Sequence, residues 1–186
     1  TFPNHHPDPL KAENLQQLIA AVREHGADMG IGLDGDGDRL GVVDGDGTIV
    51  YADRYLIALA TYLLEIRKGP VIFDVKCSAV LPQAIAALGG TPIMWKTGYT
   101  NLSAKMRETD AVLGGELSGH TIIPAREHYF DDGAFAGAYP REIAPVLISK
   151  ILSAAISASI ARSAAARKRG APAEKNASCS SNLVKR

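Results

Sequence analysis

The chain has 186 residues, 46% of them hydrophobic, and its 20 lysines and arginines balance its 20 aspartates and glutamates. This length suffices for one or two modest globular domains, and the neutral charge gives no electrostatic argument for nucleic-acid or membrane partners. The two cysteines, Cys77 and Cys179, lie far apart and imply no disulfide framework. We therefore expect a cytoplasmic protein with no nucleic-acid or membrane partner.

Helix and strand signals alternate from the start of the chain. Residues 10–25 carry apolar side chains at helical spacing, and Gly26 predicts the end of that helix. Strand-like runs follow at about 28–33 and 39–43, on either side of a loop rich in aspartate and glycine.

A second Asp-Gly cluster occupies residues 44–47, between two apolar runs, and is typical of a hairpin turn. This hairpin predicts that the first sheet is mixed rather than purely parallel. Asp53 is expected to cap a leucine-rich helix over residues 54–68.

Gly69-Pro70 breaks the pattern and predicts a domain boundary. Strands and helices continue to alternate beyond it, with strands over 71–75, 91–95, 110–114 and 121–123 and helices over 79–88 and 101–108. The alternation predicts an α/β fold, with two consecutive three-layer domains whose sheets are mixed.

The loop at residues 34–39 reads DGDGDR and is the most informative segment of the chain. Like charges this close repel one another unless a cation lies among them, and a hard divalent cation takes oxygen ligands. The glycines free the backbone so that Asp34, Asp36 and Asp38 can converge. The alternative is a solvated turn, but the flanking strands and the following Arg39 favour a metal site.

Two other kinds of loop share part of this pattern. An EF-hand requires glycine at loop position 6 and glutamate at position 12; counted from Asp34, those positions hold Arg39 and Gly45, which excludes it. A haloacid-dehalogenase-like phosphatase also places alternating aspartates after a strand and would use Asp34 as its nucleophile. Such a loop would have threonine or valine in place of Asp38, so this class is retained only as the alternative.

A second motif, GGELSGH at residues 114–120, follows a short apolar run. Glu116, Ser118 and His120 bring an acceptor, a hydroxyl and a ring nitrogen onto a glycine-rich loop that allows close approach. Such a set suits the adjacent hydroxyls of a sugar. Taken alone, a polar turn explains the motif equally well.

The two motifs, in this order, resemble the metal loop and the sugar-recognition loop of the α-D-phosphohexomutases, the phosphomannomutase/phosphoglucomutase family. The resemblance covers about residues 1–138. Four further segments are similar to that family: FPNHHPDPLKAENL at 2–15, DVKCS at 74–78, WKTGYTNLSAKMRE at 95–108 and YFDDG at 129–133.

The resemblance implies Mg²⁺ as the cofactor, held by Asp34, Asp36 and Asp38 together with a phosphoserine oxygen. It also implies that Arg39 and Lys76 are catalytic cations, placed to stabilise phosphate oxygens or the charge that develops on them.

The resemblance further implies that Glu116, Ser118, His120 and Gly98 bind the substrate. The substrates would be hexose phosphates, namely mannose or glucose 1-phosphate, 6-phosphate and 1,6-bisphosphate. In this family a phosphoserine passes its phosphoryl group to the hexose phosphate, and the 1,6-bisphosphate reorients and returns the other phosphoryl group. Glucose, mannose and glucosamine all stay open as the preferred sugar.

By the same resemblance, residues 1–69 form the second domain of such an enzyme, with the metal loop, and residues 70–138 form the third, with the sugar loop. The sequence starts inside a family motif and contains no phosphoserine loop. We therefore expect a fragment that is inactive on its own. A non-enzymatic metal- or sugar-binding remnant is the remaining alternative.

Three positions depart from the family pattern. Tyr99 replaces a histidine, Ser103 replaces a lysine and Tyr129 replaces a glycine. Tyr99 lies in a loop close to the expected substrate, where a tyrosine can form hydrogen bonds but cannot exchange a proton as histidine does.

The family pattern ends near residue 138. Residues 139–186 are dominated by alanine, serine and basic residues. We expect a solvated, atypical tail rather than a membrane helix over 144–161 or a basic patch at 167–169. Our hypothesis is a reading-frame shift near residue 138, which translation of the coding DNA in its other two frames would test.

Overall fold

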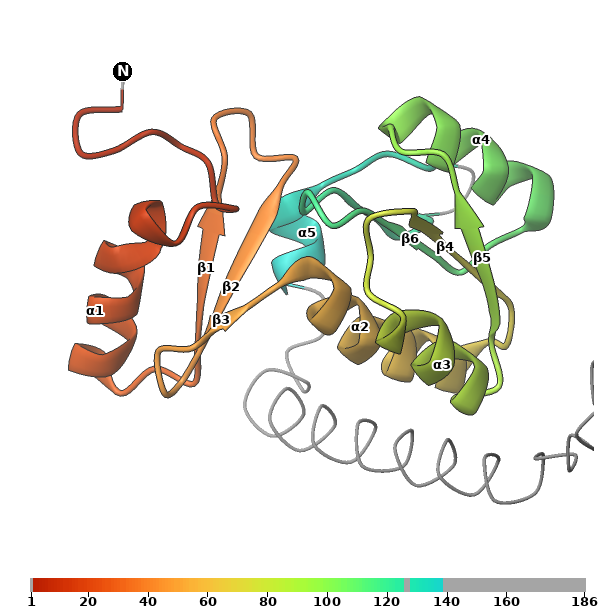
Figure 1. Ribbon diagram of the computed structural model, residues 1–186, viewed down its shortest axis with the longest axis horizontal. Helices are drawn as coiled ribbons and strands as arrows, with labels where there is room; N and C mark the ends of the chain where they lie inside the picture. Colours follow the sequence, from red (N-terminus) through yellow and green to blue (C-terminus); the bar gives the residue numbers. More distant parts are fainter. Residues whose placement is uncertain (1, 126–127, 139–186) are drawn as a thin grey trace, which may run out of the picture.

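The computed structural model describes residues 2–125 and 128–138. Two β-sheets lie side by side, each with helices on its faces, as Figure 1 shows. The predicted α/β class is confirmed, and the second of the two sheets is mixed. The predictions for residues 139–186, including the solvated tail and the reading-frame hypothesis, lie outside the described residues.

The first sheet contains β1 (Met29–Leu33), β2 (Leu40–Asp44) and β3 (Ile49–Val50), in that order across the sheet. Both pairs of neighbours are antiparallel. The predicted hairpin is therefore confirmed, while the parallel strand of a mixed first sheet is not among the described strands. A short 3₁₀ helix, η1 (Ala12–Leu15), and α1 (Gln16–His25) precede the sheet, and α1 covers one face.

The turn between β2 and β3 is organised by Asp44. Its Oδ1 accepts hydrogen bonds from the backbone N–H groups of Asp46 (3.1 Å) and Thr48 (2.8 Å). These bonds satisfy the turn internally, so the second Asp-Gly cluster is the structural turn that the sequence predicts. Gly26 closes α1 in the left-handed conformation, with φ of 58°, also as predicted.

Helix α2 (Ala52–Ile66) begins earlier than predicted, and the predicted capping role of Asp53 is wrong. Tyr51 occupies the N-cap position in an extended conformation, and no side chain caps the helix. Asp53 lies in the first turn, where its Oδ2 accepts the backbone N–H of Ser78 at 3.2 Å. The carboxylate therefore ties the start of α2 to the loop that carries Lys76.

The second sheet has the strand order β5-β4-β6-β7 and is mixed. Its strands are β4 (Pro70–Asp74), β5 (Thr91–Trp95), β6 (Leu113–Gly115) and β7 (Thr121–Ile122). β4 pairs in parallel with β5 and β6, and β6 pairs antiparallel with β7. The carboxyl ends of β4, β5 and β6 therefore lie at one edge, and so do the loops that follow them.

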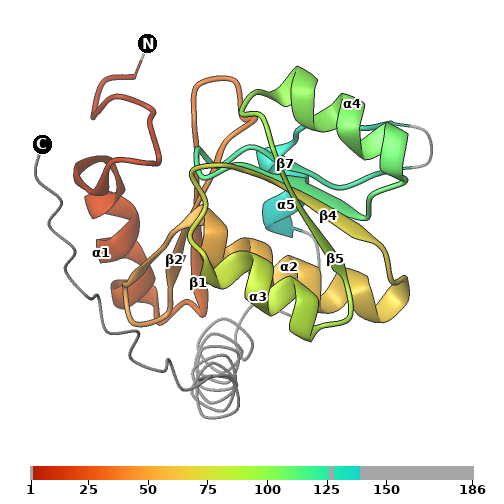
Figure 2. The ribbon, with the colours of Figure 1, turned by 45° about the vertical axis from the view of Figure 1, so that its right-hand side comes forward.

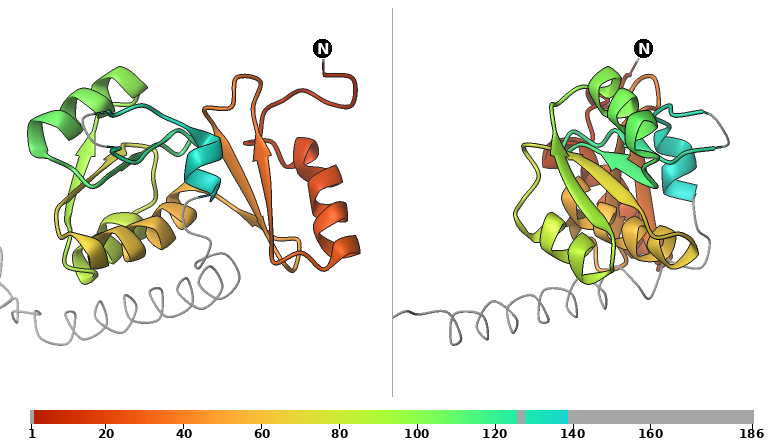
Figure 3. Two further views of the ribbon diagram at one scale, coloured as in Figure 1. Left: turned by 180° about the vertical axis from the view of Figure 1, so that it is seen from behind. Right: turned by 90° about the vertical axis from the view of Figure 1, so that its right-hand side faces the viewer.

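Helices cover both faces of the second sheet, which gives the predicted three layers (Figure 2). α2 and α3 (Val80–Ala87) lie on one face, and α4 (Tyr99–Thr109) lies on the other. α5 (Gly133–Ala138) packs against β1, β2 and β7, between the two sheets (Figure 3). Among the described residues, none of the helices has the length and apolar character needed to span a membrane.

One apolar core joins the two sheets through α2. It contains side chains from β2, α2 and the second sheet, and Leu56, Ile57 and Leu64 of α2 are each at most 1% exposed. Burial of this size is the main source of stability in such a fold. The predicted domain boundary at residue 69 stays a prediction; α2 lies before it and contacts α3 and β6.

Candidate active site

The two motif loops each connect the strands of an antiparallel hairpin, and they meet. The DGDGDR loop (residues 34–39) connects β1 to β2, and the GELSGH loop (residues 115–120) connects β6 to β7. The backbone N–H of Leu40 donates to the carbonyl of Gly119 at 3.2 Å. The acidic loop of the first sheet therefore lies directly against the glycine-rich loop of the second.

Asp34 is the structural centre of the DGDGDR loop. Its Oδ1 accepts hydrogen bonds from the backbone N–H groups of Gly37 (3.0 Å) and Arg39 (3.1 Å), and its Oδ2 accepts one from Arg39 Nε at 2.5 Å. Burial would raise the pKa of Asp34, but the hydrogen bonds from Arg39 hold it below its usual value. Both oxygens accept hydrogen bonds, so Asp34 holds the loop in its turn conformation.

The three aspartates of this loop can share one cation. One oxygen from each of Asp34, Asp36 and Asp38 lies within 4.8 Å of the others. Asp38 Oδ1 is buried without a hydrogen-bond partner among the described residues. Burial raises the pKa of Asp38; His120 opposes this, and Asp34 adds to it. A buried carboxylate oxygen without a donor is suited to bind a cation, so these residues fit a hard divalent ion bound through oxygen.

Arg39 faces the acidic groups of the loop. Besides its bond to Asp34, its Nη1 lies 3.7 Å from Asp8 Oδ1 and its Nε lies 4.0 Å from Asp38 Oδ1. The hydrogen bond to Asp34 raises the pKa of Arg39 above its usual value. The predicted catalytic cation is thus also the internal counter-ion of the loop, and Asp8 is a partner that the sequence did not predict.

Glu116 organises the GELSGH loop from a buried position, at 2% exposure. Its Oε1 accepts the backbone N–H of Gly98, and its Oε2 lies 2.9 Å from both Ser118 Oγ and His120 Nδ1. Burial opposes ionisation, but the bonds from His120, Gly98 and Ser118 hold the pKa of Glu116 below its usual value. The structure brings the four predicted substrate-binding residues together in one hydrogen-bonded cluster.

His120 connects this cluster to the acidic loop. Its Nε2 lies 3.4 Å from Asp38 Oδ2 and 4.0 Å from Asp131 Oδ2. The hydrogen bond to Glu116 raises the pKa of His120 against the effect of burial, and Asp38 adds to the shift. Asp38, His120 and Asp131 form a second group with cation-binding geometry. Asp131 was not predicted as a site residue, although the similarity of residues 129–133 to the family was its signal.

Asp74, at the end of β4, is a fully buried carboxylate that holds three loops together. Its Oδ1 accepts the Leu117 backbone N–H and the Cys77 thiol, each at 3.2 Å, and its Oδ2 accepts the Thr97 hydroxyl at 3.2 Å. These donors come from the loops after β6, β4 and β5. Those three loops carry all the predicted site residues of the second sheet, so Asp74 fixes their relative positions.

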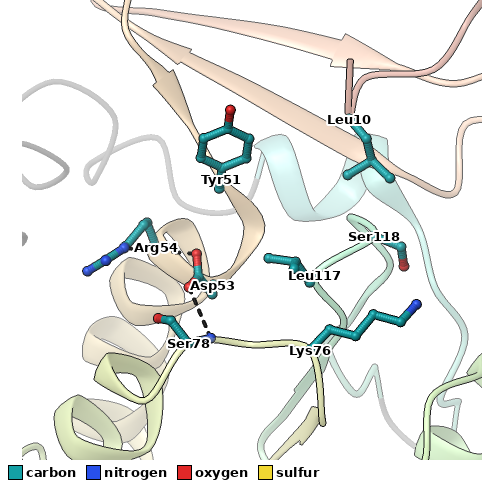
Figure 4. A pocket seen from close by; sticks show the side chains of 8 residues that line it. All are labelled: Leu10, Tyr51, Asp53, Arg54, Lys76, Ser78, Leu117 and Ser118. Atoms are coloured by element: carbon teal, nitrogen blue, oxygen red, sulfur yellow. Dashed lines mark hydrogen bonds and ion pairs between the residues drawn. The ribbon is translucent and has the colours of Figure 1, made fainter. Parts of the chain in front are cut away.

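Lys76 lies apart from the acidic loop. Its side chain is exposed and has no hydrogen bond or ion pair with the described residues. In Figure 4 its ammonium group lies on the Ser118 side of a cavity, and Arg54 and Ser78 lie on the opposite side. The cavity, of about 510 Å³, has the size of a small-molecule site. Its other lining residues are Leu10, Tyr51, Asp53 and Leu117.

Two of the three departures from the family pattern contact each other. The Tyr99 hydroxyl donates to the Tyr129 carbonyl at 3.1 Å, and both side chains pack on the apolar cluster beneath α4. Ser103 is 3% exposed, and its hydroxyl donates to the Thr100 carbonyl at 3.4 Å. The three departures therefore lie in the packing around α4, and the polar cluster at Glu116 is made by other residues.

The fold and the site together define an α/β protein in which an acidic loop of one sheet meets a polar, glycine-rich loop of the other. The profile for "Phosphoglucomutase/phosphomannomutase, alpha/beta/alpha domain III" matches residues 51–167, and the profile for domain II matches residues 1–47. The chain belongs to the phosphoglucomutase/phosphomannomutase family, a family of phosphoryl-transferring enzymes, and is a fragment that covers domains II and III. The two matched ranges are separated by residues 48–50, just before α2 begins at Ala52.

Curated relatives agree with this assignment. The chain is 50% identical over 143 residues to a phosphomannomutase/phosphoglucomutase of Pseudomonas aeruginosa, a match that covers 76% of this chain and 31% of the relative. It is 49% identical over 144 residues to a phosphoglucomutase of Neisseria meningitidis, which covers 77% of this chain and 31% of that protein. The chain thus spans about a third of the length of the relatives it matches.

Solved structures share the fold. A phosphoglucomutase/phosphomannomutase family protein from Burkholderia thailandensis aligns with a TM-score of 0.74 and 45% identity, over 82% of this chain and 34% of that one. A structure described as a phosphomannomutase from Thermus thermophilus aligns with a TM-score of 0.72 at 21% identity, over 82% of this chain and 36% of that one. The second likeness concerns the fold alone.

Gly119 is a position where the meeting of the two loops predicts a measurable cost. Its φ is +101°, and a Cβ there would lie 2.9 Å from the Leu40 carbonyl oxygen. Gly119→Ala is expected to lower the free energy of unfolding by about 2 kcal/mol, from backbone strain and steric overlap. Urea denaturation measures this loss.

The matched control is Gly89→Ala. Gly89 also has a positive φ, of +80°, but a Cβ there would meet only the side chain of Lys68, at 3.5 Å or more. This variant is expected to lose only the backbone term, about 1 kcal/mol. Equal losses in the two variants would mean that the loops do not approach each other as closely as described.

Proposed function

We propose that the longer protein containing this chain interconverts hexose 1-phosphate and hexose 6-phosphate, with glucose or mannose as the hexose. The reaction would pass through a phosphoserine, supplied from outside this chain, and a hexose 1,6-bisphosphate. The observation that carries the proposal is the approach of His120 to Asp38, at 3.4 Å, which places a cation loop against a cluster suited to sugar hydroxyls. The chain alone is expected to be inactive.

The cation in this proposal is Mg²⁺, held by Asp34, Asp36 and Asp38. The family uses a metal ion, and an oxygen-only donor set favours a hard divalent cation. When bound, Mg²⁺ supplies charge stabilisation for phosphate oxygens. Arg39 keeps Asp34 ionised and orients it, so the loop needs little rearrangement to bind a cation.

The sugar would be held by Glu116, Ser118 and His120. Glu116 offers a carboxylate acceptor and His120 a ring nitrogen, and the Ser118 hydroxyl can act as donor or acceptor. The Gly98 amide holds the Glu116 carboxylate in place. Neighbouring hydroxyls of a hexose present donors and acceptors in turn, so this cluster can bind the sugar in either of two orientations, which a reorienting bisphosphate requires.

Lys76 would act on phosphate rather than on the sugar ring. Its exposed ammonium group has no partner among the described residues, and it lines the cavity beside Ser118. A cation without an internal counter-ion at the rim of a site is suited to a phosphate group of a bound substrate. Hexose phosphates are therefore the proposed small-molecule partners of this surface.

The test is a titration of the isotope-labelled chain with glucose 1,6-bisphosphate, followed by NMR, with and without Mg²⁺. We expect saturable shifts at residues 114–120. Glu116→Gln is expected to weaken binding at least about tenfold, because a charge-assisted acceptor becomes a neutral amide.

The matched control for this titration is Glu108→Gln. Glu108 lies on the exposed side of α4 and, within residues 2–125 and 128–138, pairs only with Lys105. Its removal is therefore expected to leave the shifts at 114–120 unchanged. A dispersed spectrum without saturable shifts at those residues would contradict the proposed sugar site.

A further inference from the structure

The DGDGDR loop and the GELSGH loop are joined through their backbones. Arg39 and His120 form an isolated antiparallel bridge, and the Leu40 N–H donates to the Gly119 carbonyl at 3.2 Å. A strand that follows the cation loop in one sheet is thereby paired with a loop of the other sheet. A displacement of either segment must break or carry along the other.

The phenol of Tyr55, from α2, lies at this junction. Its oxygen lies 3.0 Å from the Gly119 carbonyl, 3.3 Å from the Leu40 carbonyl and 3.3 Å from the Thr121 hydroxyl. The side chain is 4% exposed, and burial raises the pKa of Tyr55 above its usual value, so the hydroxyl keeps its proton. The single hydroxyl proton faces two carbonyl acceptors. The Leu40 carbonyl belongs to the first sheet, and the Gly119 carbonyl belongs to a loop of the second.

A third segment bonds beside the same junction. The Gly133 N–H donates to the Gly37 carbonyl at 3.0 Å, and the Asp132 N–H donates to the Thr121 carbonyl at 3.3 Å. The start of α5 therefore holds the DGDGDR loop and the first residue of β7, which directly follows the GELSGH loop. Tyr55 adds a side-chain hydroxyl to these backbone bonds.

We infer that Tyr55 is a positioning residue that couples the two loops, so that a divalent cation bound at the DGDGDR loop orders the GELSGH loop. The inference rests on the proposed function, because it requires the proposed cation site. A ligand orders a distant segment only through contacts that both segments share. Neutralising Asp34, Asp36 and Asp38 removes their repulsion and fixes the adjoining backbone at Leu40, and the Tyr55 hydroxyl holds that backbone to Gly119.

The experiment is hydrogen exchange of backbone amides, measured by NMR on the full 186-residue chain with and without Mg²⁺. The amides of Gly37 and Arg39 report on the cation loop, since both donate to Asp34. The amide of Glu116, which donates to the His120 carbonyl at 3.0 Å, reports on the GELSGH loop. In the unmodified chain, Mg²⁺ is expected to slow exchange about tenfold at all three amides, and thus in both loops.

Tyr55→Phe removes only the hydroxyl. In this variant Mg²⁺ is expected still to slow exchange at Gly37 and Arg39 in full, but to slow it less at Glu116, because the Leu40–Gly119 backbone bond remains. Tyr62→Phe, a matched change on the same helix, is expected to keep the effect at both loops. The amide of Phe73, inside β4, shows whether a variant has lost stability generally, because a purely structural role of Tyr55 would speed exchange there too.

The outcomes separate the coupling from the cation site itself. Slowing at Gly37 without slowing at Glu116 in the unmodified chain would overturn the coupling and leave the cation site intact. Undiminished slowing at Glu116 in Tyr55→Phe would overturn the role of Tyr55. No slowing at either loop would contradict the proposed cation site, and the coupling with it.

Discussion

Replacing Asp74 by alanine is expected to lower the free energy of unfolding by about 3 kcal/mol. The carboxylate is fully buried, and its removal leaves the Leu117 amide, the Thr97 hydroxyl and the Cys77 thiol without an acceptor. Each buried donor left unpaired costs about 1–3 kcal/mol, least for the weak thiol donor. Relief of the buried negative charge offsets part of this loss.

Urea unfolding followed by the fluorescence of Trp95, the single tryptophan, measures the effect in the second sheet. Asp74→Asn is the matched control. Its remaining carbonyl oxygen can accept from Leu117 and Cys77, and its amide can donate to the Thr97 hydroxyl, so we expect a loss of only about 1 kcal/mol. If both variants lost the same stability, the carboxylate would not be the acceptor that joins the three loops.

Replacing Asp34 by alanine is expected to abolish most of the cation affinity of the chain and to destabilise it without a cation. A lost carboxylate ligand lowers the affinity by about 100-fold or more. Two backbone amides and Arg39 Nε also lose their acceptor, which costs about 2 kcal/mol net of the relieved repulsion among the aspartates.

Thermal unfolding with and without Mg²⁺ separates the two effects, because a ligand that binds the native state raises its melting temperature. The unmodified chain should melt at a higher temperature in Mg²⁺, and Asp34→Ala should not respond. Asp46→Asn is the control, since Asp46 is an exposed aspartate in the other Asp-Gly turn and contributes only backbone groups to its hydrogen bonds. A full Mg²⁺ response in Asp34→Ala would exclude Asp34 as a ligand.

Most elements of the fold follow from local patterns in the sequence. The strand predicted over 91–95 agrees with β5, and the hairpin at 44–47 has the predicted antiparallel strands. The last strand before the GELSGH loop begins later than predicted. Asp110 takes a left-handed conformation, with φ of 51°, as the C-cap of α4. The residues directly after it connect the helix to the sheet, and β6 begins only at Leu113.

The candidate site could be predicted only where its residues share a motif. Asp34, Asp36 and Asp38 are close in sequence, and so are Glu116 and His120, which lets spacing and chemistry point to each loop separately. The contact between the loops depends on how two sheets pack around α2, and no local pattern encodes that packing. Asp74 and Tyr55 were missed for this reason, since their partners lie elsewhere in the chain. Asp131 lies in the segment 129–133, whose similarity to the family could have pointed to it.

The pairing of Leu40 with Gly119 also restricts how this part of the chain can change in evolution. The last residues of the two loops are paired with each other. A residue inserted in either loop would therefore shift Arg39 out of register with His120. The lengths of the DGDGDR loop and the GELSGH loop are therefore expected to stay constant together among related proteins. Variation in length is expected instead at the turn that follows Asp44, whose bonds run to Asp44 itself and to Arg23 of α1.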